Sequence, residues 1–450
     1  MKIKKITLIF SDLLLISWVA FAPAGMCQDI NEKIKSLEDM LKAQQETIQK
    51  QQEIIKQLQE ELDQIKKQAA EIPAKPEEKP SYTSGGLFGA ASAYNPNISL
   101  ILDTFGYSSS LKKDELEKWN IPSFISEGID HKEGMNIHAA ELYLFAPVDP
   151  FFNLYATIPV KQEGVELEEA YLITTNLPAG LQAKIGKFKS GFGRLNSQHS
   201  HVWNFVDQPL IYRAFVGHEG INEKGIQLTW LPQLPIYTQF GVEALQGENE
   251  ILFGSDASSG LHAFSAFIKS SIDVGDYGTL LFGPSVIAGK TRTDSIAEDH
   301  IFSGDSTLIG FEFTYKWKPS RWKSFTLQSE YMYRHQKGKL QDTTTQAIQN
   351  LTRSQDGIYL QSIYQTGRWG FGTRYDLLEP FKDQYKLDGA NISFGNKPWR
   401  ASAMVEFNPS EFSKIRFQYN YDKSARDGRT NNEWFIQFIG GVGAHAAHTF

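Results

Sequence analysis

Hydrophobic residues recur at alternating spacings of three and four from Ile30 to Ile72, and this segment contains no glycine, proline or aromatic residue. A mean spacing near 3.5 residues predicts a coiled coil of about six heptads, roughly 64 Å long. Position a of the heptad is filled by Ile34, Leu41, Ile48, Ile55, Leu62 and Ala69, and position d by Ile30, Leu37, Gln44, Gln51, Leu58, Ile65 and Ile72. We therefore predict an α-helical coiled coil over residues 25–72.

The residues of this core also predict the number of helices. Isoleucine at both a and d favours three strands over two, so we expect a homotrimer. The polar layers at Gln44 and Gln51 cost stability but fix the register and the number of chains. Prolines at positions 73, 76 and 80 end the helix, and we assign residues 73–90 to a stiff proline-rich linker.

Beyond Ser81 the period changes from 3.5 to two, and aromatic residues become frequent. In the stretch 413–423 one face carries Ile415, Phe417, Tyr419 and Tyr421, whereas the opposite face carries Lys414, Arg416, Gln418, Asn420 and Asp422. The stretch 309–318 alternates in the same way. This pattern predicts β-strands with one apolar and one charged face.

Two features favour a membrane barrel over a soluble sandwich. Many alternating segments reach ten residues, which is longer than strands of soluble sheets usually are. Their second face carries formal charges that a packed core would not accept unpaired. A closed barrel places the apolar face against lipid and the charged face against water, and it leaves no open sheet edge.

We expect an all-β transmembrane barrel over residues 91–450, with about 16 antiparallel strands and a range of 14 to 18. Seventeen candidate strands are visible, one more than an even-numbered barrel accepts: 98–107, 135–146, 151–160, 165–174, 180–188, 224–231, 235–246, 261–272, 277–290, 305–318, 322–335, 355–366, 368–378, 387–395, 398–408, 413–423 and 431–441. Polar stretches at 292–306 and 338–353 are predicted to be external loops. Residues 190–223 are a possible constriction loop that folds into the pore.

The N-terminus predicts export. Lys2, Lys4 and Lys5 precede an apolar run, and small residues follow at 22–24, which is typical of a cleaved signal peptide over residues 1–24. The single cysteine, Cys27, permits no disulfide within one chain, and the Met26 before it departs from a lipidation signal. The formal net charge of -7 argues against a nucleic-acid partner.

Two short motifs resemble a known family. Residues 186–194, Gly-Lys-Phe-Lys-Ser-Gly-Phe-Gly-Arg, resemble a stretch of the phosphate-selective porin family. The ending 443–450 resembles the G-x-H-x-A-H-x-F terminus of a related uncharacterised group, and Phe450 resembles a barrel-assembly signal. The resemblance implies a trimeric 16-stranded porin with basic constriction residues, which map to Lys187, Lys189, Arg194 and, less directly, Arg213. The acidic balance of the chain departs from a phosphate-selective lining.

Histidine pairs are candidate metal ligands. His199 and His201 are two residues apart, so both rings fall on one face of an extended segment, and His445 and His448 are three apart. Neutral imidazole is a common ligand of transition metals. The alternative is that the first pair simply lies in the constricting loop and the second in a terminal assembly strand.

No Gly-Xaa-Ser-Xaa-Gly or His-Glu-Xaa-Xaa-His motif occurs, so we expect no enzyme, and no cofactor is predicted. We expect a porin in the outer membrane, contacting its lipid, with the coiled coil in the periplasm. It would pass small hydrophilic solutes or ions, with phosphate as a candidate. The alternative is a structural anchor whose coiled coil tethers the membrane to the peptidoglycan of the cell wall.

Overall fold

The computed structural model divides the chain into two compact units, Met1–Gly89 and Ala90–Phe450. It describes residues 96–124, 129, 131–161, 164–254, 260–291, 294–297 and 300–443, together with Lys42 and Lys56, both of which are helical. The predicted signal peptide and linker, nearly all of the coiled coil, and His445, His448 and Phe450 lie outside the described residues. Among the described residues, no helix is long and apolar enough to cross a membrane.

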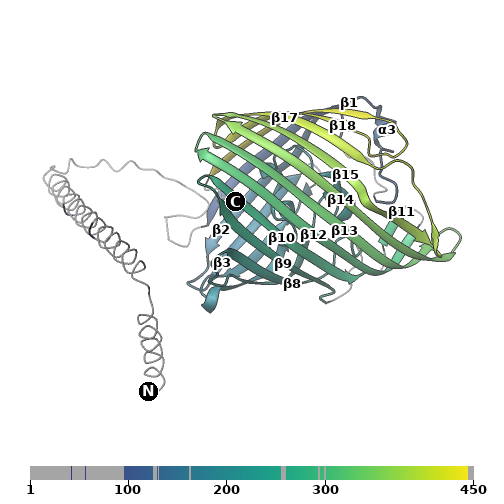
Figure 1. Ribbon diagram of the computed structural model, residues 1–450, viewed down its shortest axis with the longest axis horizontal. Coiled ribbons are helices and arrows are strands. Elements are labelled where there is room, and N and C mark those ends of the chain that lie inside the picture. The colour runs from purple at the N-terminus through teal and green to yellow at the C-terminus, as the bar shows by residue number, and fades with distance from the viewer. Residues whose placement is uncertain are drawn as a thin grey trace, which may run out of the picture. The chain divides into compact units, whose positions relative to one another are not determined.

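The second unit is a closed antiparallel β-barrel of sixteen strands (Figure 1). Closure follows from pairing of the first strand with both the second and the last. The strands are β1 (Asn97–Ser109), β2 (Gly134–Pro147), β3 (Phe152–Lys161), β5 (Glu169–Thr174), β6 (Leu181–Lys189), β7 (Asn222–Trp230), β8 (Tyr237–Leu245), β9 (Ala263–Val274), β10 (Gly278–Lys290), β12 (His300–Ser320), β13 (Lys323–Asp342), β14 (Ile348–Thr366), β15 (Trp369–Leu387), β17 (Trp399–Ser410), β18 (Ser413–Asp422) and β19 (Asn431–Gly443).

The barrel also contains shorter elements. Three strands of two to four residues lie in its loops, namely β4 (Gly164–Val165), β11 (Asp294–Ala297) and β16 (Ala390–Asn391). The described helices are α3 (Lys113–Leu116) and α4 (Leu210–Phe215), with 3-10 turns η2 (Pro178–Gly180), η3 (Leu195–Ser197) and η4 (Ser200–Val202).

The predicted alternation determines which side chains face outward. In β12, Ile309 and Phe311 are 46% and 45% exposed, whereas Glu312 is 1% exposed. In β18, Phe417 is exposed, and Arg416 is fully buried. The outer surface of the barrel is thus apolar, and charged side chains such as Glu312 and Arg416 point inward, which is the arrangement that a bilayer requires.

Aromatic side chains gather at two levels of the outer surface. One exposed group lies where strands meet the short turns that connect them in pairs: Trp230, Tyr277, Trp322 and Trp369. Towards the other end a row of ring contacts crosses neighbouring strands, joining Tyr375 to Trp399, Trp399 to Tyr421, and Tyr419 to Trp434. Two such rows are typical of interfacial girdles that flank a hydrocarbon layer.

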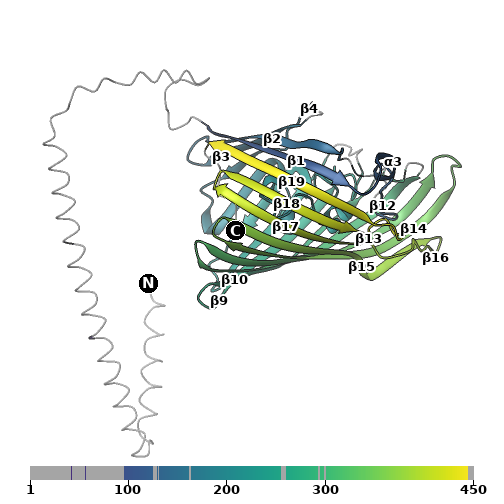
Figure 2. The same ribbon diagram turned by 90° about the horizontal axis from the view of Figure 1, so that it is seen from above.

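Three sequence predictions about strands are wrong. Residues 292–306, predicted to be an external loop, contain β11 and the start of β12. The surplus candidate strand, 387–395, is the connection between β15 and β17 and contributes only β16. Residues 338–353 are not mainly a loop, because β13 and β14 continue through them and pair residue by residue, as at Lys339 and Asn350. The long strands β12 to β15 project past their neighbours at the end of the barrel that carries the longer loops, opposite the short turns (Figures 1 and 2). A hairpin that projects into water needs no apolar face, so its strands lack the alternation that would have revealed them.

Candidate functional site

The connection between β6 and β7, residues 190–221, folds into the lumen and is called the inward loop below. Its helix α4 packs against β13, β14 and β15. Apolar side chains of the loop, including Phe192, Ile211 and Phe215, join inward-pointing residues of the barrel wall in one buried cluster. The loop therefore covers part of the wall, here called the covered wall (β12 to β15).

Glycines in the covered wall make room for these side chains. A Cβ atom at Gly310 would lie 2.8 Å from the ring of Phe192, and one at Gly357 would lie 2.8 Å from Ile211. Such separations are closer than packed carbon atoms approach. The absence of side chains at these positions thus permits the close approach of the loop.

Charged groups of the wall hold the backbone of the inward loop. Glu330 of β13 accepts hydrogen bonds from the hydroxyls of Tyr212 and Tyr359, both at 2.7 Å, and from the backbone N–H of Arg194 at 2.8 Å. It also accepts from the backbone N–H of Leu195 at 3.2 Å. These bonds satisfy a carboxyl group that burial would otherwise penalise.

A second anchor lies at Asp207 of the loop. Its carboxylate pairs with Arg374 of β15 at 2.8 Å and with Arg400 of β17 at 2.7 Å. Burial alone would raise the pKa of Asp207, but the two guanidinium charges hold it well below its usual range. The inward loop is therefore held at two places before α4, near Arg194 and at Asp207, and within α4 at Tyr212.

Another part of the wall, β2, β3, β5 and β6, is called the open wall because it faces cavities. A larger cavity of about 450 Å³ reaches towards the short turns and is lined by Gln182 and Tyr237. A smaller cavity of about 260 Å³ reaches towards the long loops and is lined by His131 and Glu219. Glu141 and Lys189 line both, so they lie at the boundary between the two cavities, called the narrow point below.

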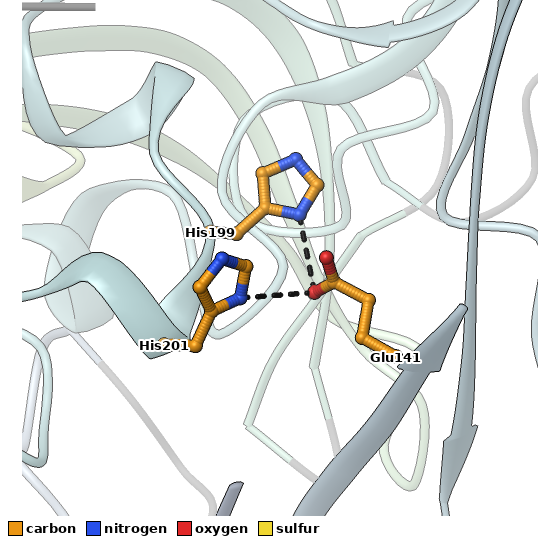
Figure 3. Close-up of side chains that lie close together, drawn as sticks. All are labelled: Glu141, His199 and His201. Atoms are coloured by element: carbon orange, nitrogen blue, oxygen red, sulfur yellow. Dashed lines mark hydrogen bonds and ion pairs between the residues drawn. The ribbon is translucent and has the colours of Figure 1, made fainter. Parts of the chain in front are cut away.

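His199, His201 and Glu141 meet at this point (Figure 3). The Nδ1 atoms of His199 and His201 lie 3.2 Å and 3.3 Å from Oε2 of Glu141. Glu141 projects from β2, whereas the histidines lie where the extended backbone at His199 enters η4. The 3-10 turn, rather than the extended segment that the sequence analysis assumed, brings both rings to the same side.

A second carboxylate orients the first histidine. Nε2 of His199 lies 2.8 Å from Oε2 of Glu169, which projects from β5. Burial disfavours the charged form of His199, but its hydrogen bonds to Glu141 and Glu169 outweigh this and raise its pKa to about 10. Lys189 neutralises a further carboxylate nearby, Glu168, at 2.8 Å.

The candidate constriction residues separate into two groups. Lys189 and Arg194 line the larger cavity, and Arg213 lines the smaller one. Lys187 instead lies in a groove with Ile185 and Ile226, both exposed on the outer face, and its Nζ donates to the backbone oxygen of Leu167. Lys187 thus points away from the lumen and is not part of the constriction.

The carboxylates of the site, Glu141 and Glu169, were not predicted from the sequence. Alternation along β5 places Glu169, Tyr171 and Ile173 on the lumen face, so the inward direction of Glu169 could have been predicted. Its partner in the loop could not, because the contact spans 30 residues and depends on how the loop folds.

These features define a closed transmembrane-type β-barrel whose lumen is narrowed by an inward loop. A protein of Aquifex aeolicus (strain VF5), described as uncharacterized, is 40% identical to this chain over 384 residues, which is 80% of each chain. The chain belongs to the same protein family as this Aquifex protein. No family model matches the chain.

Solved outer-membrane channels are similar in fold but distant in sequence. The channel DcaP of Acinetobacter baumannii is 13% identical, with a TM-score of 0.50 over 79% of this chain and 99% of that one. An anion-selective porin from Comamonas acidovorans is 9% identical, with a TM-score of 0.49 over 77% of this chain and 99% of that one. The similarity to DcaP supports the barrel fold. Neither similarity supports the phosphate selectivity that the resemblance of residues 186–194 implied.

Proposed function

We propose that the protein is an outer-membrane porin that allows passive diffusion of small hydrophilic solutes. The observation that carries this proposal is the pair of cavities inside a closed barrel, separated by a narrow polar point. The apolar outer surface with two aromatic rows supports placement in a bilayer. The fixed inward loop would set the width of the path, and the side chains at the narrow point would set its charge.

Steady conductance in planar bilayers tests this proposal. The full chain, purified in mild detergent, should produce stepwise current increases that persist at constant voltage. A protein that inserts but produces no steady channels would contradict the porin proposal and favour the structural anchor. Insertion itself is checked by flotation of the same protein with liposomes.

The lining supports weak rather than strong charge selectivity. Of the described residues that line the larger cavity, the basic ones are Lys184, Lys189, Arg194 and Lys269, and the acidic ones are Glu141 and Glu169. The smaller cavity has the opposite balance, with basic residues Lys161, Lys189, Arg213 and Arg400 and acidic residues Glu141, Glu168, Asp207, Glu219, Asp422 and Glu433. We propose a modest anion preference at the larger cavity and no dedicated phosphate site.

The proposed assembly is a homotrimer held by the coiled coil over residues 25–72. The core residues Ile34, Leu41, Ile48, Ile55 and Leu62, with Gln44 and Gln51, support this proposal through their heptad spacing. Native mass measurement in mild detergent should give three copies of the chain. A monomer that persists with residues 25–72 intact would contradict it.

A further inference from the structure

The cluster at the narrow point has the composition and spacing of a transition-metal site. Its three ligand atoms, two imidazole nitrogens and one carboxylate oxygen, lie within 4.8 Å of one another. Four-coordinate zinc binds such atoms at about 2.0–2.2 Å, which places neighbouring ligands roughly 3.3 Å apart. The observed separations between Glu141 Oε2 and the two Nδ1 atoms, 3.2 and 3.3 Å, match this geometry.

The surroundings of the cluster also fit a metal. Glu169 lies 2.8 Å from the other ring nitrogen of His199, and a carboxylate at that nitrogen is the usual outer partner of a metal-bound histidine. This contact orients the ring and directs Nδ1 towards Glu141. Because Glu169 acts through His199, it is a positioning residue.

An ion can reach the cluster from water. His199, His201 and Glu141 all line the larger cavity, so the site has an entry path and space for a water molecule as fourth ligand. Three protein ligands with one open position are typical of accessible rather than purely structural zinc sites. Metal and proton compete for Nδ1 of His199, so the affinity for the metal is expected to fall as the pH falls.

We propose that Glu141, His199 and His201 bind a divalent transition-metal ion, with Zn²⁺ as the probe, and that the bound ion narrows the pore. Binding itself does not depend on the proposed porin function, whereas the narrowing of the path rests on it. The two parts are therefore tested by different measurements.

Equilibrium dialysis with Zn²⁺ tests the site in the full chain after metal is removed with a chelator. The expected result is one Zn²⁺ per chain, with affinity at least about tenfold weaker in His201→Ala and in Glu141→Gln. Glu169→Gln should weaken it by about 10- to 100-fold through the orientation of His199. Mg²⁺, which prefers oxygen ligands, should not compete at equal concentration.

His138→Ala is the matched control, because His138 lines the smaller cavity and pairs with Asp103 rather than with the cluster. Its Zn²⁺ affinity should equal that of the wild type. No saturable binding by the wild type, or binding unchanged in His201→Ala and Glu141→Gln, would overturn the site. If a variant fails to fold, X-ray absorption of the zinc-loaded wild type decides: two imidazoles in the first shell support the site, and none overturns it.

Single-channel conductance tests the narrowing. Micromolar Zn²⁺ should lower the conductance of the wild type and of His138→Ala, but not that of His201→Ala. Channels that bind Zn²⁺ without any change in current would overturn the narrowing alone. Zinc binding by a protein that forms no channels would instead overturn the proposed porin function and leave the site standing.

Discussion

Inward side chains of the covered wall lie against protein, whereas those of the open wall lie against cavities. On the covered wall, Leu308, Met332 and Leu378 pack with the inward loop. The carboxylate of Glu330 accepts hydrogen bonds from the same loop. On the open wall, Glu141 and Lys189 line the space through which solute would pass. The same alternating strand pattern therefore supplies side chains that pack against the inward loop on one wall and side chains that line the cavities on the other. The position of the inward loop determines which of the two a strand does.

This difference implies that charged lumen residues are not equally important for permeation. Those on the covered wall should determine stability and the position of the loop. Those on the open wall should determine conductance and selectivity. The predictions below test this division, beginning with the largest expected effect.

Replacing Glu330 should damage the covered wall most. Glu330→Ala leaves four donors without their acceptor, which should lower the free energy of unfolding by about 3–5 kcal/mol. Urea unfolding in detergent, followed by tryptophan fluorescence, measures the change. Glu166→Ala breaks a partly exposed pair with Lys161 and should cost less than about 1 kcal/mol. An equal loss of unfolding free energy in Glu330→Ala and Glu166→Ala would contradict the proposed difference between the two walls.

Filling the space at Gly310 should have a smaller effect on the same wall. Gly310→Val forces Phe192 of the inward loop to move, at an expected cost of about 1–3 kcal/mol. Limited proteolysis should also cut the loop faster. Gly440→Ala is the control, since its Cβ would meet no atom within 4 Å, and its stability should change by less than about 0.5 kcal/mol. A stable Gly310→Val protein with a protected loop would show that the loop is not packed there.

Reversing a charge on the open wall should change selectivity, and at Lys189 it should also cost stability because its pair with Glu168 is buried. Lys189→Glu places a third carboxylate beside Glu168 and Glu169 and should shift the permeability ratio towards cations by about fivefold or more. Reversal potentials in a salt gradient measure this ratio. Lys187→Glu, on the outer face, should leave the ratio unchanged. The same shift in both variants would contradict the assignment of the two lysines.

The alternation of strands such as β12 and β18, the approximate strand number and the position of the inward loop could all be predicted from the sequence. The covered wall could not, because inward apolar residues such as Leu308 and Met332 follow no binary pattern until the loop that covers them is known. The motif 186–194 wrongly predicted that Lys187 and Lys189 both lie in the constriction, and the reason is local. Alternation places both lysines on one face, but the chain turns into the lumen directly after Lys189, where the backbone N–H of residue 190 bonds to Ile221.

A reactive group placed on the inward loop, in the larger cavity that the open wall lines, tests the central claim most directly. Ser197 is exposed in the larger cavity, and Cys27 is the only cysteine in the sequence, so Ser197→Cys in a Cys27→Ser background offers a single thiol. Addition of a thiol-reactive sulfonate during single-channel recording should lower the conductance in one step per subunit and leave the Cys27→Ser parent unchanged. A current that is unchanged after the thiol has been shown to react would mean that ions do not pass along the open wall.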